Sequence, residues 1–203
     1  MIKTIIFDLG NVIVHVNHEK MFNGFASKSG KSLEYIKNYY KNSSARKLFE
    51  MGKIKPMQFY EQINKDLNLK VDFDNFCDVY CDIFTLNKDV ANLINKLKKE
   101  YRLILLSNTD ELHFEHIKKK FKIVNVFDEY VLSYKVGHTK PNPLIFIESI
   151  KESGTAPFNC AYFDDVFEFI IVARLMGVKA FQFKDYEKLK VDLMRNNILT
   201  KNL

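Results

Sequence analysis

Five short stretches of the chain are almost entirely apolar, without regular alternation of apolar and polar residues. A strand covered on both faces has no polar side, so such stretches are typical of the buried strands of a parallel sheet. Helix-length segments separate the later stretches, which predicts a doubly wound parallel α/β sheet. The predicted strands are Thr4–Phe7, Arg102–Leu106, Tyr130–Ser133, Cys160–Phe163 and Val178–Phe181. The predicted helices between them are Leu112–Phe121, Pro143–Ser153 and Phe167–Met176.

The segment from residue 15 to residue 87 has a different pattern. Apolar residues recur there at helical spacing, and no convincing strand lies between the helical stretches. The predicted helices are Leu33–Asn42, Ala45–Met51, Pro56–Leu67 and Phe73–Phe84. We therefore expect residues 1–14 and 88–203 to form an α/β core, with residues 15–87 inserted after the first strand as an all-helical cap.

The chain of 203 residues has a formal net charge of +6, which fits acidic ligands such as phosphorylated metabolites, nucleic acid or an anionic membrane. Residues 15–87 have a net charge of +2 and the remainder +4, so no region concentrates basic residues as a nucleic-acid surface would. No apolar run approaches the roughly 18 residues of a membrane span. Three cysteines, an odd number, favour a reducing compartment. We expect a cytoplasmic protein that binds neither nucleic acid nor membranes.

Polar residues that can bind a ligand or take part in catalysis follow several predicted strands. Asp8 ends the first strand, Ser107–Thr109 the second, and Asp164 with Asp165 the fourth, while Lys140 lies in the loop after the third. Ligands of open parallel sheets bind at the carboxyl ends of the strands, so these residues are expected to meet at one edge. A single acidic residue at a strand end is often only a helix cap, but several such residues in this order favour a shared site.

The chemistry of these residues fits a phosphoryl group and a hard cation. Carboxylates from two strands suit Mg²⁺, which prefers oxygen ligands. A serine hydroxyl and the backbone amides at the start of the next helix can hold phosphate oxygens, and a lysine can neutralise their charge. One aspartate can also attack phosphorus and form a covalent aspartyl-phosphate. We therefore expect a magnesium-dependent phosphoryl-transfer site.

Four sequence motifs resemble those of the haloacid dehalogenase superfamily, in the same order and with matching spacing from residue 5 to about residue 181. They are Ile6–Val12, Leu105–Thr109, Val136–Pro141 and Tyr162–Asp165. The resemblance implies a Rossmann-like core with a small helical cap at the position of residues 15–87. The first motif is most similar to that of small sugar-phosphate phosphatases with the motif Asp-Leu-Gly-Asn-Val, which include a glucose-1-phosphate phosphatase.

The resemblance also implies a role for each candidate residue. Asp8 would be the nucleophile, and Lys140 would assist catalysis. The implied Mg²⁺ ligands are Asp8, the Gly10 carbonyl, Asp164 and Asp165. The implied phosphate ligands are Ser107, Asn108 and Lys140. For Asp165, capping of the following helix is the alternative interpretation.

Gly10 departs from the family pattern. Most phosphatases of the superfamily carry a second aspartate there, which protonates the leaving group and later activates water. Losing a general acid–base typically costs about 10²–10⁴ in rate. The loss matters least for a good leaving group, so we expect a sugar 1-phosphate or an acyl phosphate as substrate. His15, or failing that His18, is the candidate surrogate because imidazole titrates in the useful range. The alternative for His15 is a loop histidine that faces solvent or lines the hinge of the cap.

These observations favour a magnesium-dependent phosphatase that hydrolyses a small phosphorylated metabolite through an aspartyl-phosphate on Asp8. Two alternatives remain open. One is a non-catalytic protein that binds a phosphorylated ligand, because Gly10 removes the proton-transfer group. The other is a dehalogenase in which Asp8 attacks carbon without a metal, although the pair Asp164–Asp165 speaks against it. The sequence is compatible with a monomer or a homodimer.

Overall fold

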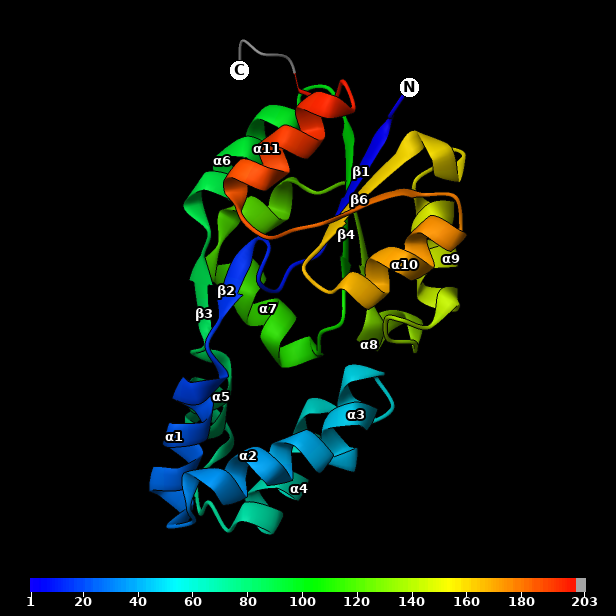
Figure 1. The fold of residues 1–203 in the computed structure, drawn as a ribbon. Coiled ribbons are helices and arrows are strands. Elements are labelled where there is room, and N and C mark those ends of the chain that lie inside the picture. Colours follow the sequence, from blue (N-terminus) through cyan, green and yellow to red (C-terminus); the bar gives the residue numbers. More distant parts are fainter. Residues whose placement is uncertain (200–203) are drawn as a thin grey trace.

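A five-stranded parallel sheet forms the centre of the computed structural model, which describes residues 1–199 (Figure 1). Its strands are arranged in the order β5-β4-β1-β6-β7, so the sequence moves outward from β1 in both directions, as in a doubly wound sheet. The strands are β1 (Thr4–Phe7), β4 (Arg102–Ser107), β5 (Glu129–Leu132), β6 (Cys160–Asp164) and β7 (Lys179–Gln182). All five strands lie within one residue of the predicted bounds at each end, and β1 matches at both ends.

Helices cover both faces of this sheet (Figure 1). Alternate residues of the central strand point to opposite faces: Ile5 and Phe7 belong to one apolar cluster, and Ile6 belongs to the other. Both faces are therefore dry, which explains why the strands are apolar without alternation. The core helices are α6 (Lys88–Leu97), α7 (Glu111–Lys120), α8 (Ser133–Val136), α9 (Pro143–Glu152), α10 (Phe167–Leu175) and α11 (Tyr186–Arg195), with the 3₁₀ turns η1 (Lys122–Val126) and η2 (Pro157–Asn159).

Five further helices form a separate helical unit beyond the carboxyl ends of the strands, which we call the cap (Figure 1). They are α1 (His18–Ser29), α2 (Leu33–Asn42), α3 (Ser44–Glu50), α4 (Pro56–Leu67) and α5 (Phe73–Cys81). Stacked aromatic side chains fill the space between these helices: the rings of Phe49 and Phe59 lie 4.4 Å apart, and Phe76 stacks on Tyr80 at 5.5 Å. Among residues 1–199, the structure contains no helix that is both long and apolar enough to cross a membrane.

Two short antiparallel strands connect the cap to the core, and the sequence pattern did not predict them. They are β2 (Val14–Val16) and β3 (Phe84–Leu86), paired with His15 opposite Thr85. The predicted helix Phe73–Phe84 therefore ends at Cys81, and Phe84 starts a strand. Three residues are too few for a clear period-two pattern, so only the pairing of distant segments defines these strands. The pairing of β2 with β3 fixes where the chain leaves the core for the cap and where it returns.

Candidate active site

The candidate residues on the sheet lie on neighbouring strands. Asp8 directly follows β1, Ser107 ends β4, and Asp164 ends β6. Because β1 lies between β4 and β6, these three residues share the carboxyl edge of the sheet, as the sequence predicted. Phe7 pairs with both Leu105 and Phe163, so the three strands end nearly level.

Lys140 reaches into the centre of this edge. Its ammonium nitrogen lies 2.7 Å from Asp8 Oδ1 and 2.6 Å from Asp164 Oδ2, and it also donates to the Leu106 carbonyl at 3.2 Å. The residue is 4% exposed, so these interactions replace its hydration. Burial alone would lower the pKa of Lys140, but the two carboxylates outweigh it and raise the pKa above the ordinary value. Lys140 is therefore a fixed positive charge between two carboxylates.

The Asp8 carboxyl group is nearly buried, with 7% of the residue exposed. Burial raises its pKa to about 7, and the neighbouring Asp164 adds to this effect, while Lys140 opposes it. The Asp8 amide donates to the Phe163 carbonyl at 2.9 Å, which anchors the residue to β6. The side chain is thus held firmly, with one oxygen on Lys140.

Asp8, Asp164 and Asp165 form a cluster in which one carboxylate oxygen from each lies within 4.8 Å of the others. Three oxygen donors at this spacing suit a hard divalent cation such as Mg²⁺, so the residues fit the metal that the sequence predicted. Asn11 donates to Asp165 Oδ2 at 3.2 Å and orients it. Helix α10 starts after its N-cap residue Val166 without a side-chain cap hydrogen bond, and the Val166 backbone amide donates to Asp164 Oδ1. Asp165 therefore does not act as the helix cap considered above.

The phosphate-binding candidates differ in what their side chains do. Ser107 is buried at the end of β4 and lines a cavity between core and cap. The Asn108 side chain is engaged on both sides by the backbone of Lys140: its Nδ2 donates to the Lys140 carbonyl at 2.9 Å, and its Oδ1 accepts from the Lys140 amide at 2.7 Å. Asn108 therefore holds the loop that carries Lys140, a role that the sequence analysis did not assign to it.

Gly10 lies where the chain turns from β1 toward the cap. A Cβ atom at this position would meet only Val16 Cγ2, at 3.5 Å, which is an ordinary contact. The structure does not bring His15 into the site: it is exposed on β2, and the flanking residues Val14 and Val16 line the cavity instead. Strand alternation is the reason, since neighbouring side chains point to opposite sides. His18 does line the cavity.

Two residues of the site were missed from the sequence. The Tyr162 hydroxyl donates to Asp164 and lies 3.3 Å from Lys140 Nζ. The sequence could have indicated this contact, because residues two apart on a strand share a face and Tyr162 precedes Asp164 by two positions. Asn11 has a left-handed backbone (φ 54°) that places its side chain toward Asp165, and no pattern in the sequence indicates that contact.

The cavity above the site has a volume of about 170 Å³ and is lined by residues from both units. The core contributes Gly10 and the stretch 107–110, and the cap contributes His18, Tyr40, Arg46 and Glu50. A substrate with its phosphate at the sheet edge would place the rest of the molecule here.

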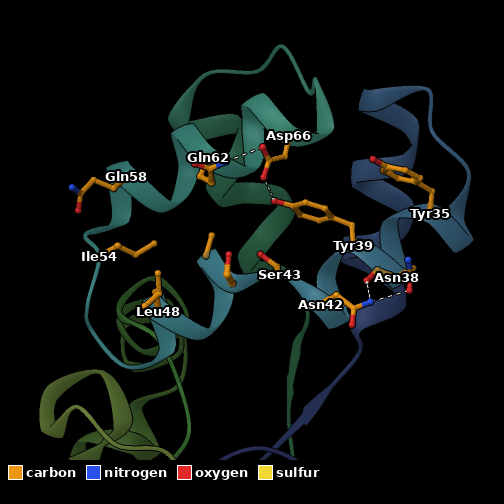
Figure 2. Close-up of a pocket in the computed structure, with 12 residues that line it drawn as sticks. Tyr35, Asn38, Tyr39, Asn42, Ser43, Leu48, Ile54, Gln58, Gln62 and Asp66 are labelled. Atoms are coloured by element: carbon orange, nitrogen blue, oxygen red, sulfur yellow. Dashed lines mark hydrogen bonds between the residues drawn. The ribbon is translucent and has the colours of Figure 1, made fainter.

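A larger cavity of about 630 Å³ lies within the cap, lined by α2, the start and middle of α3, and α4 (Figure 2). Its polar groups largely satisfy each other: Tyr39 and Gln62 both donate to Asp66, and Asn42 donates to Asn38 (Figure 2). None of the candidate residues lines it, whereas Gly10, Ser107 and Asn108 line the smaller cavity.

The sequence matches the haloacid dehalogenase-like hydrolase family over residues 2–177. The chain belongs to this family. The hydrolase is 28% identical to the D-ribitol-5-phosphate phosphatase of Bacteroides thetaiotaomicron over 190 residues, which is 90% of this chain and 92% of the relative. It is 32% identical to the rat N-acylneuraminate-9-phosphatase over 97 residues, covering 47% of this chain and 39% of that enzyme.

Solved structures show the same fold. A haloacid dehalogenase family enzyme from Bacteroides thetaiotaomicron, crystallised with magnesium and inorganic phosphate, superposes with a TM-score of 0.85 at 24% identity, covering 93% of this hydrolase and 99% of that chain. The L-2-haloacid dehalogenase of Xanthobacter autotrophicus has a TM-score of 0.65 at 16% identity, covering 98% of this hydrolase and 85% of that chain. The predicted Rossmann-like core is therefore confirmed.

Proposed function

We propose that this hydrolase is a magnesium-dependent phosphatase that acts on a small phosphorylated metabolite through an aspartyl-phosphate on Asp8. The observation that carries the proposal is the cluster of three carboxylates, two of which, Asp8 and Asp164, contact the buried ammonium group of Lys140. A dehalogenase has no use for three carboxylates placed to hold a cation. The cluster therefore favours phosphoryl transfer over the dehalogenase alternative.

Asp8, the Gly10 carbonyl, Asp164 and Asp165 would hold Mg²⁺, which when bound neutralises phosphate charge and orients the phosphoryl group. An Asp8 oxygen attacks phosphorus, the bond from phosphorus to the leaving oxygen breaks, and the phosphoryl group is carried on Asp8. Water then attacks phosphorus, which releases inorganic phosphate and restores the carboxylate. Lys140 stabilises the negative charge that builds up on the phosphoryl oxygens.

Ser107 supports this proposal from the other side of the phosphate. Its hydroxyl group lies in the segment that leads from the end of β4 to the N-terminus of α7, and a helix N-terminus favours anions. Asn108 acts on the phosphate indirectly, by holding the backbone of Lys140 in place. The phosphate would thus lie between Ser107 and Lys140, with Asp8 in line.

The substrate follows from Gly10. Glycine transfers no proton, so the leaving group departs without a general acid at that position. A leaving oxygen whose hydroxyl form has a low pKa departs most readily without such help. We propose a sugar 1-phosphate as the substrate, whose anomeric oxygen is such a leaving group. A faster hydrolysis of plain alkyl phosphates than of sugar 1-phosphates would contradict this choice.

A phosphatase screen over a panel of metabolites, with Mg²⁺ and with EDTA, tests the proposal. We expect phosphate release that requires Mg²⁺ and disappears in Asp8→Asn, which keeps the shape of the side chain. Release that survives EDTA would overturn the metal requirement. A protein that binds phosphorylated ligands but releases no phosphate would instead be the non-catalytic binder that Gly10 allows.

A further inference from the structure

The cavity between core and cap contains charged residues from both units, and they occur as two pairs. On the cap, Arg46 Nη1 lies 2.5 Å from Glu50 Oε1 within helix α3. On the core, His113 Nδ1 lies 2.9 Å from Asp110 Oδ2 at the start of α7. All four residues line the cavity. The wall that faces the leaving group is therefore strongly polar.

The charges of the core pair can be assigned from geometry. The second ring nitrogen of His113 lies 3.0 Å from the carbonyl oxygen of Tyr80, so both ring nitrogens face acceptors. An imidazole satisfies two acceptors only when both nitrogens carry hydrogen, which makes it a cation. The Tyr80 hydroxyl donates to Asp110, which fits an ionised carboxylate. His113 and Asp110 thus cancel each other's charge.

The cavity wall as a whole is consequently neutral. Arg46 cancels Glu50 and His113 cancels Asp110, and no other lysine, arginine, aspartate or glutamate lines this cavity among the described residues. The remaining histidine, His18, has its pKa lowered by desolvation and by the nearby cations His113 and Arg46, which favours the uncharged imidazole. A charged group on the substrate would enter this space without a free counter-charge, which is costly in a partly buried site.

The wall nevertheless offers unused hydrogen-bonding groups. Arg46 uses Nη1 on Glu50 and Nε on the Tyr40 carbonyl, and in the described part of the chain Nη2 has no partner. The same holds for Glu50 Oε2. A guanidinium group only donates and a carboxylate only accepts, so side by side they match hydroxyl groups, which do both. Neighbouring hydroxyl groups on one molecule fit this pair best.

We propose that the leaving group of the substrate is uncharged and polyhydroxylated, and that Arg46 and Glu50 are the residues that select it. The inference rests on the proposed phosphatase function and deepens it. It favours a sugar or polyol phosphate over an acyl phosphate. It also disfavours phosphorylated sugars that carry a carboxylate near the hydroxyl groups that would bind Arg46 and Glu50.

The test compares two sugar 1-phosphates that share the anomeric leaving oxygen and differ at one group. Glucose 1-phosphate has a primary hydroxyl group where glucuronate 1-phosphate has a carboxylate. We expect the wild type to hydrolyse glucose 1-phosphate with a kcat/KM at least tenfold higher. Glu50→Gln leaves Arg46 uncompensated, so the ratio of kcat/KM for the carboxylated to the neutral substrate rises about tenfold; Arg46→Gln leaves Glu50 uncompensated, so this ratio falls.

Glu148→Gln is the matched control, because Glu148 forms a comparable ion pair with Lys151 on the exposed surface of α9 and lies outside the cavity. The ratio should not change in this variant. The inference would be overturned if the ratio of kcat/KM for the carboxylated to the neutral substrate changed in the same direction in Glu50→Gln and Arg46→Gln. A wild type that prefers the carboxylated substrate would also overturn it. Phenyl phosphate separates this failure from that of the phosphatase proposal: no release from any substrate, phenyl phosphate included, would overturn both.

Discussion

The ammonium group of Lys140 lies 2.7 Å from a carboxylate oxygen of Asp8, although the two residues are 132 positions apart in the sequence. The same nitrogen lies 2.6 Å from Asp164, and the side chains of Lys140 and Asp164 are almost completely buried. One buried cation thus joins the ends of two strands and the loop that follows a third. These ion pairs hold together the carboxyl edge of the sheet, where the candidate residues lie.

Lys140→Met tests this charge arrangement through stability. The substitution keeps an unbranched side chain as far as the Cε position but removes the ammonium group, which leaves two buried carboxylates without their cation. Breaking a buried ion pair in this way typically costs about 3–5 kcal/mol, and we expect the free energy of unfolding in urea with EDTA to fall by that amount. Lys151→Met, at an exposed ion pair, should change it by less than about 0.5 kcal/mol. Similar losses in both variants would show that Lys140 is not structurally coupled to the carboxylates.

Gly10→Asp tests whether the missing proton donor limits the enzyme. The site has room for a Cβ atom, because its nearest neighbour is Val16 Cγ2 at 3.5 Å. If the new carboxyl group acts as a general acid, hydrolysis of alkyl phosphates should accelerate by about 10²-fold or more, with a smaller gain for sugar 1-phosphates. Gly10→Asn has the same shape without the proton transfer and serves as the control. An equal effect of both substitutions would argue against a missing general acid.

The two histidines near the start of the cap are expected to behave differently. His15 is exposed and turned away from the cavity by strand alternation, so the structure favours retained turnover in His15→Ala. His18 lines the cavity, and His18→Ala is expected to raise KM for the substrate. Steady-state kinetics over a range of pH checks both. A loss of turnover with an altered pH profile in His15→Ala would instead assign it the surrogate role considered from the sequence.

The Asp110–His113 pair predicts how stability changes with pH. Burial would lower the pKa of His113, but Asp110 outweighs it and raises the pKa above 6.5. A raised native pKa contributes stability that is complete below the unfolded value of about 6.5 and is lost as pH rises through the native value. The stability advantage of the wild type over His113→Gln in urea unfolding should therefore shrink as pH rises above about 6.5. A stability difference between the wild type and His113→Gln that stays constant with pH would contradict the Asp110–His113 ion pair.

Much of the fold was readable from the sequence for a physical reason. The strands of the central sheet are apolar on both faces, so β1 was predicted at its observed bounds. Three strand ends and the loop before α9 supplied the candidate residues. Helices α2 and α4 were also predicted at their observed bounds, because an apolar stripe at helical spacing is a local signal.

The remaining features depend on contacts between distant segments. Strands β2 and β3 have three residues each and exist through their pairing with each other. The side chain of Asn108 was expected at the phosphate, but it binds the Lys140 backbone, because the loop before Pro141 folds back against β4. Arg46 and Glu50 line the cavity only because the cap docks on the core. From the sequence, their i,i+4 spacing predicts only an ion pair on the surface of a helix.

Direct detection of a phosphorylated Asp8 tests the central claim. The enzyme is mixed with Mg²⁺ and a sugar 1-phosphate labelled in its phosphoryl group, quenched within a single turnover, and digested for peptide mapping. We expect a hydroxylamine-sensitive label on the peptide that contains Asp8, and none in Asp8→Asn. Magnesium-dependent turnover without any label on Asp8, or turnover that survives in Asp8→Asn, would contradict the account.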